Sequence, residues 1–211
     1  MTLQPFHEPA DIERRSFAII DAEAPSPRPF TGHAWEIARR LVHTSADFSL
    51  LGDMHLPDAA IAAGIAALRG GASIYTDTEM ARAGMPRRRL DPLGCRAECL
   101  LALPGVSDTA RRLAVTRSRA ALLAARDLLP GSILAVGNAP TTLIALAELL
   151  DRGAAPPALV IAMPVGFVNA AESKELILEK PIPCLALRGR RGGSPLAAAT
   201  LNALAEIALR G

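Results

Sequence analysis

The spacing of apolar residues divides the chain into short strands and longer helices. Short apolar runs bounded by glycine, proline or polar residues are typical of buried strands. Five such runs occur, and each is followed by a polar or glycine-containing turn. They predict strands at residues 72–76, 96–103, 132–136, 158–163 and 183–187.

Between these runs, apolar residues recur every three or four positions, which is the spacing of one face of a helix. The segment 107–129 is expected to be helical with a break near Thr116. Asp77 is expected to open a helical turn that ends at Gly84. The other predicted helices span residues 12–23, 33–44, 57–69, 140–151, 170–178 and 194–209.

Three segments show neither the short apolar runs of strands nor the three-to-four-residue spacing of helices. Residues 1–12 are expected to form a polar arm, and residues 24–32, which contain three prolines, are expected to form a loop. Residues 85–94 are predicted to be a second loop, with three consecutive arginines on the solvated surface.

The alternation of strands with helices predicts an α/β fold. Parallel strands need crossover connections, which are right-handed, and the crossover helices cover both faces of the sheet. We therefore expect a three-layer α/β/α sandwich around a mainly parallel, five-stranded sheet. The 211 residues, half of them hydrophobic, suffice for one sizeable core, so we expect a single domain over residues 1–211.

Two strand–turn–helix units stand in tandem near the C-terminal end. In LVIAMPVGFVNAAESK (159–174), Asn169 is expected to cap the helix, with Glu172 completing a capping box. The preceding unit joins a strand at 132–136 to a helix through the turn 137–140. Both turns would bring helix N-terminal amides to the sheet edge where α/β proteins bind ligands, so we expect an anionic ligand group there.

Composition excludes several classes of function. A net charge of +2 and an aromatic content of 3% argue against nucleic-acid binding. The cysteines do not suggest a secreted disulfide framework, and Cys95 and Cys99 are expected to pack in the core. No leader segment and no apolar run of about 18 residues is apparent, so a cytoplasmic protein without a membrane span is expected.

The familiar motifs for cofactors and metals are missing as well. No glycine-rich dinucleotide or phosphate loop follows a predicted strand, and no serine-hydrolase motif occurs. The four histidines never pair with cysteines at zinc spacing. We therefore expect no metal site, and a flavin or nucleotide is a weak alternative.

Arg40 and His43 lie three residues apart, on one face of a predicted helix. Arg40 could hold an acidic substrate while His43 moves a proton, because histidine is the side chain that titrates nearest neutral pH. Alternatively, both cations neutralise the last carbonyl groups of the helix, and the pattern alone favours this second interpretation.

The other candidates have equally simple alternatives. Ser16 lies in a charged patch, where an ordinary exposed position is favoured. Arg117 stands beside the predicted helix break and either faces a ligand or solvent. Asn138, in the turn after the strand at 132–136, is a further candidate for substrate binding. The segment 189–194 either binds a carboxylate or is a plain loop.

Taken together, several strings of this sequence closely resemble the precorrin-8X methylmutases of vitamin B12 biosynthesis. The resemblance covers nearly the whole chain in the same order, and VGNAPT and MPVGFVNAAESK are specific strings. The strings are SFAIIDAEA (16–24), RRLVHTSADF (39–48), GGASIYTDTEMARAG (70–84), TRSRAAL (116–122), VGNAPTTL (136–143), MPVGFVNAAESK (163–174) and GRRGGSPLAAATLNALA (189–205).

The resemblance implies a flavodoxin-like fold and a homodimer with active sites at the subunit interface. It implies an isomerase that moves a methyl group from C11 to C12 of the tetrapyrrole precorrin-8X, giving hydrogenobyrinate, or acts on the cobalt-bearing equivalent. Such an isomerisation needs no cofactor. By this resemblance His43 is the catalytic proton donor and acceptor, and Ser16 and Arg40 bind substrate.

Two departures from the family are expected to alter the pocket shape. Thr-Ser-Ala-Asp follows His43 where many relatives carry a glycine, and Ile74-Tyr75 replaces a proline-containing strand. An alternative function is a carrier that binds the tetrapyrrole without converting it, because carboxylate-binding residues alone would suffice for that role.

Overall fold

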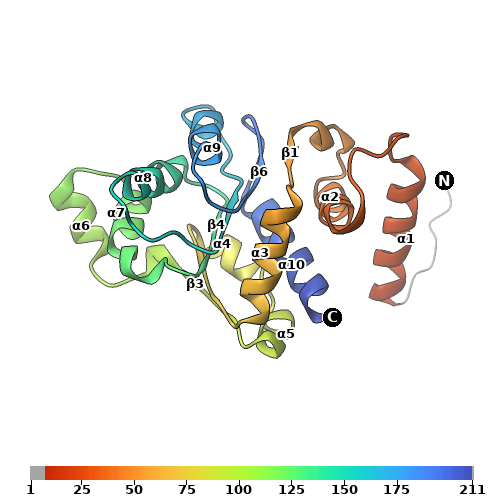
Figure 1. Cartoon of the computed structure of the whole chain (residues 1–211), viewed down its shortest axis with the longest axis horizontal. Helices are drawn as coiled ribbons and strands as arrows, with labels where there is room; N and C mark the ends of the chain where they lie inside the picture. Colours follow the sequence, from red (N-terminus) through yellow and green to blue (C-terminus); the bar gives the residue numbers. More distant parts are fainter. Residues whose placement is uncertain (1–7, 211) are drawn as a thin grey trace.

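A twisted six-stranded sheet forms the centre of the protein, whose computed structural model describes residues 8–210 (Figure 1). The strand order is β1-β6-β5-β4-β2-β3, and all neighbours pair in parallel except β1 with β6. The five parallel strands thus follow the 2-1-3-4-5 order of flavodoxin-like folds. The strands are β1 (Met54–His55), β2 (Ser73–Thr76), β3 (Arg96–Cys99), β4 (Ile133–Val136), β5 (Leu159–Ala162) and β6 (Cys184–Leu187).

The predicted α/β class and mainly parallel sheet are confirmed, but the strand count of five was one too low. The extra strand β1 pairs antiparallel with β6 at the sheet edge, with Met54 opposite Leu187. Two residues cannot show a period of two, so the sequence pattern gave no sign of this strand. Its pairing fixes the segment that follows α2 at the carboxyl end of β6.

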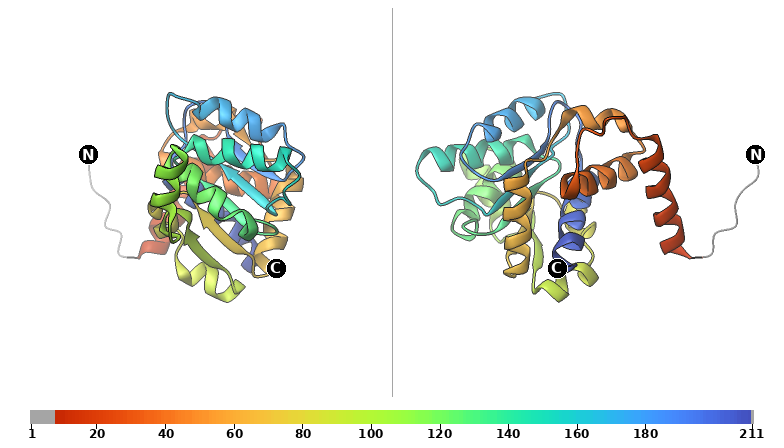
Figure 2. Two further views of the ribbon diagram at one scale, coloured as in Figure 1. Left: turned by 90° about the vertical axis from the view of Figure 1, so that its left-hand side faces the viewer. Right: turned by 45° about the vertical axis from the view of Figure 1, so that its right-hand side comes forward.

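Helices cover both faces of the sheet, as Figures 1 and 2 show. On one face, α2, α3 and α10 pack around a core of aliphatic side chains. On the other face, α7, α8 and α9 cover a second core. The helices are α1 (Pro9–Glu23), α2 (Gly32–Ser45), α3 (Asp58–Arg69), α4 (Glu79–Ala83), α5 (Arg87–Leu90), α6 (Val106–Leu113), α7 (Arg117–Ala124), α8 (Pro140–Asp151), α9 (Ala170–Leu178) and α10 (Ser194–Leu209), with short 3-10 turns η1 (Phe48–Asp53), η2 (Asp91–Leu93), η3 (Leu100–Ala102) and η4 (Arg126–Leu128).

The predicted boundaries of α8, α9 and α10 are confirmed. Pro140 and Pro195 occupy first-turn positions of α8 and α10, where a missing N–H costs nothing. The predicted break near Thr116 is also present, because the Thr116 hydroxyl accepts a hydrogen bond from the Arg119 amide and begins α7 there.

Four local predictions were wrong. Thr78, not Asp77, caps α4, because the Thr78 hydroxyl accepts the Ala81 amide. The expected loop 85–94 contains α5 and η2, and the strand predicted to reach residue 103 ends at Cys99. The polar arm predicted for residues 1–12 is helical from Pro9 onward, while residues 1–7 lie outside the described part.

Helix α1 projects from the body and packs on α2 (Figure 2). Ile20 is the α1 residue that joins the buried core. Ile12 and Ile19, in contrast, are 50% and 47% exposed. The helix therefore offers an apolar surface that the rest of the described chain leaves uncovered.

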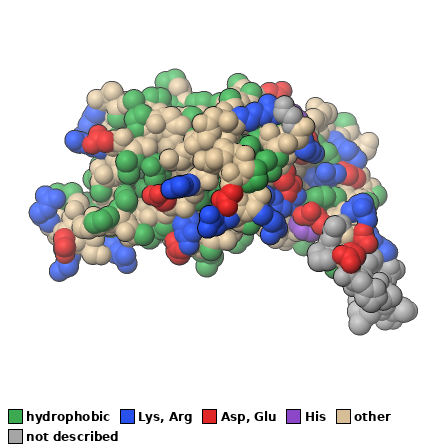
Figure 3. All heavy atoms as spheres, turned by 90° about the horizontal axis from the view of Figure 1, so that it is seen from below, with side chains coloured by type: hydrophobic (Ala, Val, Ile, Leu, Met, Phe, Trp, Pro, Cys, Tyr) green, Lys and Arg blue, Asp and Glu red, His purple; other side chains and the backbone are tan. Residues whose placement is uncertain are grey.

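The described surface and core agree with the composition. Lysine and arginine side chains are interspersed with acidic ones on the face seen in Figure 3, instead of forming one basic patch. Cys95, Cys99 and Cys184 are free and buried, as expected for core residues.

Between residues 8 and 210, no helix is both long and apolar enough to cross a membrane.

Candidate active site

His43 and Ser16 meet where α1 packs on α2. The Ser16 hydroxyl lies 2.7 Å from Nδ1 of His43, and the edge of the imidazole packs on Phe17 with ring centroids 5.2 Å apart. Both polar side chains are half-buried. Because Ser16 engages Nδ1, Nε2 is the nitrogen left to exchange a proton with a ligand. The pattern that favoured an ordinary exposed position for Ser16 was therefore misleading.

Ser16→Ala is expected to lower the activity about tenfold, because the imidazole loses the partner that selects its tautomer and orientation. NMR of the His43 ring nitrogens, alongside steady-state kinetics, would check this. Ser107→Ala, at an exposed position of α6, is the matched control and should leave the activity unchanged. Wild-type activity in Ser16→Ala would show that the hydrogen bond is not needed to orient the His43 ring.

Arg40 reaches toward α1 from the same face of α2, as the i, i+3 spacing predicted. Its Nη1 donates to Glu13 at 3.0 Å and its Nη2 to Glu206 at 2.6 Å. Arg89 also binds Glu206, through Nε at 2.8 Å. The alternative in which Arg40 neutralises helix carbonyls is therefore wrong: its guanidinium joins α1, α2 and α10 through carboxylates.

Two small grooves flank the turn of α2 that carries Arg40. One, of about 270 Å³, lies between Thr44, the end of α4 at Gly84 and the N-terminal half of α10. The other, of about 210 Å³, is lined by Phe17 and Arg39. Both fall below the ~300–1,000 Å³ usual for ligand pockets. Arg40 thus lies between two open grooves that do not enclose a ligand, and His43 lines neither of them.

The anion site expected at the N-terminus of α8 is already filled by the chain itself. Asp77, at the carboxyl end of β2, is 1% exposed and accepts the backbone amides of Gly137, Asn138 and Ala139 at 2.8, 2.8 and 2.6 Å. Burial raises the pKa of this carboxyl, although the three amides oppose the shift. The strand–turn–helix unit therefore binds an internal carboxylate, and the expectation of a ligand there is corrected.

Asn169 does not form the capping box expected at α9. Its backbone is left-handed, with φ 60° and ψ 7°, and its side chain makes no capping hydrogen bond. Asparagine tolerates this region better than other residues with a side chain. Asn169 therefore suits the sharp turn into α9 through its backbone conformation.

The structure divides the predicted site residues into two groups. Ser16, Arg40 and His43 lie together on α1 and α2. Arg117 and Asn138 are exposed at the starts of α7 and α8, which the Thr116–Thr141 hydrogen bond of 2.9 Å joins. Figure 1 places α7 and α2 at opposite ends of the molecule. One chain therefore does not bring the two groups into one site.

The backbone after His43, where the resemblance leads us to expect a glycine, has an unusual conformation. Ala46 ends α2 in the left-handed conformation, with φ 54°. A residue with a Cβ is strained there, whereas glycine is not. The segment that follows must therefore be held by other contacts.

Sequence reasoning missed two residues that hold the loops at this edge of the sheet, Lys174 and Arg191. Lys174 is fully buried, and Arg191 contacts the chain that follows α2. The sequence did carry one indication, because Lys174 is one of only two lysines in a chain whose other cations are arginines.

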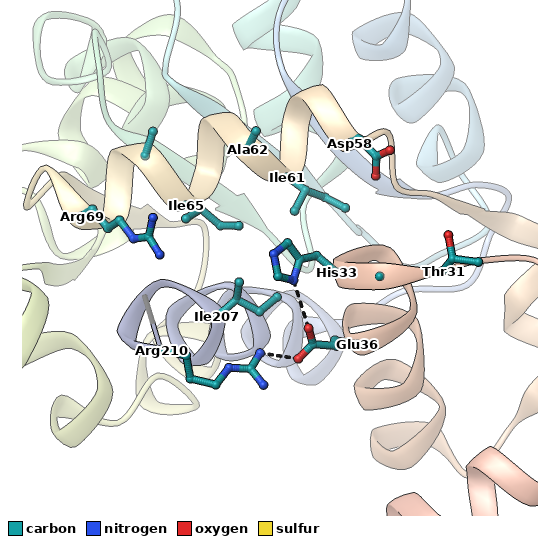
Figure 4. Close-up of a pocket in the computed structure, with 12 residues that line it drawn as sticks. Thr31, His33, Glu36, Asp58, Ile61, Ala62, Ile65, Arg69, Ile207 and Arg210 are labelled. Atoms are coloured by element: carbon teal, nitrogen blue, oxygen red, sulfur yellow. Dashed lines mark hydrogen bonds and ion pairs between the residues drawn. The ribbon is translucent and has the colours of Figure 1, made fainter.

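A larger groove, of about 1150 Å³, lies between the start of α2, α3 and the end of α10 (Figure 4). Its floor is apolar, with Ile61, Ile65 and Ile207. Among its polar groups, Glu36 binds both His33 and Arg210. Neither Ser16, Arg40 nor His43 lines this groove, so it is separate from the candidate site on α1 and α2.

Among the described residues, no group of three or more histidine, cysteine or acidic side chains is arranged to hold a metal ion. The site is therefore described through its imidazole, hydroxyl and guanidinium groups.

Comparison with known proteins shows the family of this chain. The family model described as Precorrin-8X methylmutase matches residues 11–207. The chain belongs to the precorrin-8X methylmutase family. A member from Pseudomonas aeruginosa, named Precorrin-8X methylmutase, is 44% identical over 196 residues, which cover 92% of this chain and 93% of that relative. The resemblance recognised in the sequence is thereby confirmed.

Other members of the family carry a cobalt-specific name or have a solved structure. The Cobalt-precorrin-8 methylmutase of Priestia megaterium is 39% identical over 201 residues, covering 95% of this chain and 89% of that protein. The solved structure of a precorrin-8x methyl mutase from Thermus thermophilus has a TM-score of 0.87 at 42% identity, covering 95% of this chain and 98% of the other.

Proposed function

We propose that this chain is an isomerase of cobalamin biosynthesis that moves a methyl group from C11 to C12 of precorrin-8X. The product is hydrogenobyrinate, or cobyrinate where the macrocycle already carries cobalt. The observation that carries the proposal is the family match over residues 11–207, together with the half-buried Ser16–His43 pair. A cytoplasmic location is part of the same proposal.

His43 donates a proton to the macrocycle and recovers it once the methyl group has migrated. The methyl carbon leaves C11 and bonds to C12 of the same molecule, so no atom is gained or lost. Ser16 holds Nδ1, which directs Nε2 toward the substrate. General acid–base help of this kind contributes ~10²–10⁴ in rate, and preferential binding of the transition state supplies the rest.

We propose further that a second copy of the chain completes the site, as the resemblance to this family implies. The grooves beside Arg40 are too small to enclose a tetrapyrrole. Arg117 and Asn138 would reach the macrocycle only from another subunit, because α7 and α2 are far apart in one chain. The uncovered Ile12 and Ile19 of α1 supply apolar surface for such an assembly.

The test is to incubate the purified protein with precorrin-8X and with its cobalt-bearing equivalent in parallel. Conversion, followed by absorbance and confirmed by NMR of the extracted pigment, supports the isomerase and identifies the substrate. A shifted spectrum with chemically unchanged pigment would support the tetrapyrrole carrier instead. Sedimentation in the same buffer measures whether the active species is a dimer.

Arg40→Ala is expected to raise the Kd for the tetrapyrrole about tenfold or more, because a charge-assisted hydrogen bond to a substrate carboxylate is lost. The effect on kcat should be smaller. Fluorescence or absorbance titration measures the affinity.

Glu13→Gln separates substrate binding by Arg40 from its contact with α1. This variant loses the 3.0 Å ion pair with α1 but keeps the guanidinium. Equal weakening in both variants would mean that Arg40 acts by holding α1. An unchanged affinity in Arg40→Ala would remove Arg40 from the binding site.

A further inference from the structure

Lys174 is a fully buried lysine whose ammonium group binds only backbone in the contacts described. It lies on α9, is 0% exposed, and its Nζ donates to the carbonyl oxygens of Gly189 at 2.8 Å and Arg191 at 2.6 Å. Both carbonyls belong to the loop that joins β6 to α10. Burial of a lysine is costly unless the charge is well paired, so this arrangement calls for an explanation.

The loop needs such a partner because its backbone is tightly constrained. Gly189 and Gly193 have φ of 72° and 126°, which L residues rarely adopt. A Cβ at Gly192 would lie 2.3 Å from the Met163 oxygen. The loop therefore packs backbone against backbone, and Lys174 satisfies the carbonyls that point inward.

Two further hydrogen bonds join this loop to the loop between β5 and α9. The Gly193 amide donates to the Met163 oxygen at 2.8 Å, and the Gly166 amide donates to the Arg190 oxygen at 3.1 Å. Arg190 itself is exposed and lies over the Phe167 ring, with its guanidinium carbon 5.5 Å from the ring centroid. Phe167 is 83% exposed. The loops thus present a cation and an aromatic ring together at the carboxyl edge of the sheet.

Arg191 connects the same loop to the segment that follows the helix carrying His43. Its guanidinium binds Asp47 at 3.0 Å, the hydroxyl and carbonyl of Ser49 at 2.6 and 3.0 Å, and Asp53 at 2.5 Å. These acceptors lie in the segment directly after α2, next to the strained Ala46. The Arg191 backbone is bound by Lys174, so a continuous set of contacts runs from α9 to the end of α2.

We propose that Lys174 is a positioning residue of the methylmutase site: it holds the Gly189–Gly193 loop so that Arg191 fixes the segment after His43 and Arg190 faces the substrate. The inference rests on the proposed function and deepens it. Lys174 touches no substrate, since its side chain is buried. Arg190 would bind a carboxylate group of the macrocycle, because an exposed arginine beside an aromatic ring is suited to that ligand.

The electrostatic surroundings of Lys174 agree with this role. Burial lowers its pKa to about 8, while Asp53 at the end of η1 and Glu175 on α9 act in the opposite direction. Arg188 and Arg191, from the β6 side, face the same acidic groups. A neutral amine keeps fewer donors and loses the charge assistance of its hydrogen bonds. The loop should therefore loosen as the pH rises through about 8.

The test compares Lys174→Met with Lys180→Met, which removes the other lysine. Lys180 pairs with Asp151 and does not contact the loop. For Lys174→Met we expect KM for precorrin-8X to rise about tenfold or more, with kcat within about threefold of wild type. Lys180→Met should match the wild type. An unchanged KM in a folded Lys174→Met protein overturns the proposal.

The pH profile adds a result that a merely structural role would not give. Wild-type KM should rise between about pH 7 and 9, whereas the KM of Lys174→Met should stay constant over this range. The same pH dependence of KM in the wild type and in Lys174→Met would contradict the proposal. Hydrogen exchange of the loop amides should be faster in Lys174→Met than in Lys180→Met, and equal rates would also contradict it.

Two measurements on the wild-type protein keep the proposal testable if Lys174→Met fails to fold. Lysine-selective ¹⁵N labelling gives two side-chain signals, which Lys180→Met assigns. The Lys174 signal should titrate near pH 8 and its amine should resist reductive methylation. An ordinary pKa of Lys174 together with rapid methylation of its amine overturns the proposal that the buried Lys174 holds the loop. These measurements and the exchange rates do not depend on turnover, so a failure of the isomerase proposal would be distinguished from a failure of this one.

Discussion

His43→Ala is expected to abolish conversion of precorrin-8X while the tetrapyrrole still binds. The variant loses the nitrogen that we propose donates and recovers the proton, and such general acid–base help is worth ~10²–10⁴ in rate. In the proposed site, affinity comes from arginines and apolar contacts that remain in the variant, so the Kd should change by less than about threefold. Stopped-flow absorbance measures turnover, and the spectral shift on mixing measures binding.

His33→Ala is the matched control for this result. His33 lies at the other end of the same helix α2 and hydrogen-bonds Glu36 at 3.0 Å. Its loss should leave turnover near the wild-type level. Full turnover by His43→Ala would remove His43 from the mechanism, and equal losses in both variants would point to damage of α2 itself.

Asp77→Ala is expected to cause the largest loss of stability. Three buried amides, of Gly137, Asn138 and Ala139, would lose their acceptor together. Each buried donor without a partner costs ~1–3 kcal/mol, so the free energy of unfolding should fall by at least about 3 kcal/mol. For a chain of this size that corresponds to a decrease in Tm of about 6–12 °C. Calorimetry and urea unfolding measure it.

Asp77→Asn should lose less stability than Asp77→Ala, because the side-chain amide oxygen can still accept hydrogen bonds from the backbone amides of the turn. Asp108→Asn is the surface control, since Asp108 is exposed on α6 and pairs only with Arg111 in the contacts described. It should change Tm very little. A Tm for Asp77→Ala close to that of the surface control would mean that water replaces the carboxylate without cost.

The strands and helices could be predicted because each carries its own local pattern. The buried runs of β4, β5 and β6 and the apolar periodicity of α8 and α10 depend only on neighbouring residues. The edge strand β1 could not be predicted, because its two residues pair with β6 more than 130 positions later.

The candidate site was predicted less completely, for the same reason. The i, i+3 spacing correctly placed Arg40 and His43 on one face. The acceptors of Arg40, however, are Glu13 and Glu206, which are 27 and 166 positions away in the chain. Asp77 likewise reaches amides that lie about 60 positions later. Interactions at such distances leave no pattern in a single sequence.

Because α1 projects from the body, the protein can lose its activity while its core stays folded. Ser16 on α1 hydrogen-bonds the imidazole of His43, the proposed proton donor, yet α1 contributes only Ile20 to the buried core among its described side chains. Local opening of such a peripheral helix costs less free energy than global unfolding. On heating, the enzyme should therefore become inactive while its sheet is still intact, so thermal inactivation would report the detachment of one helix.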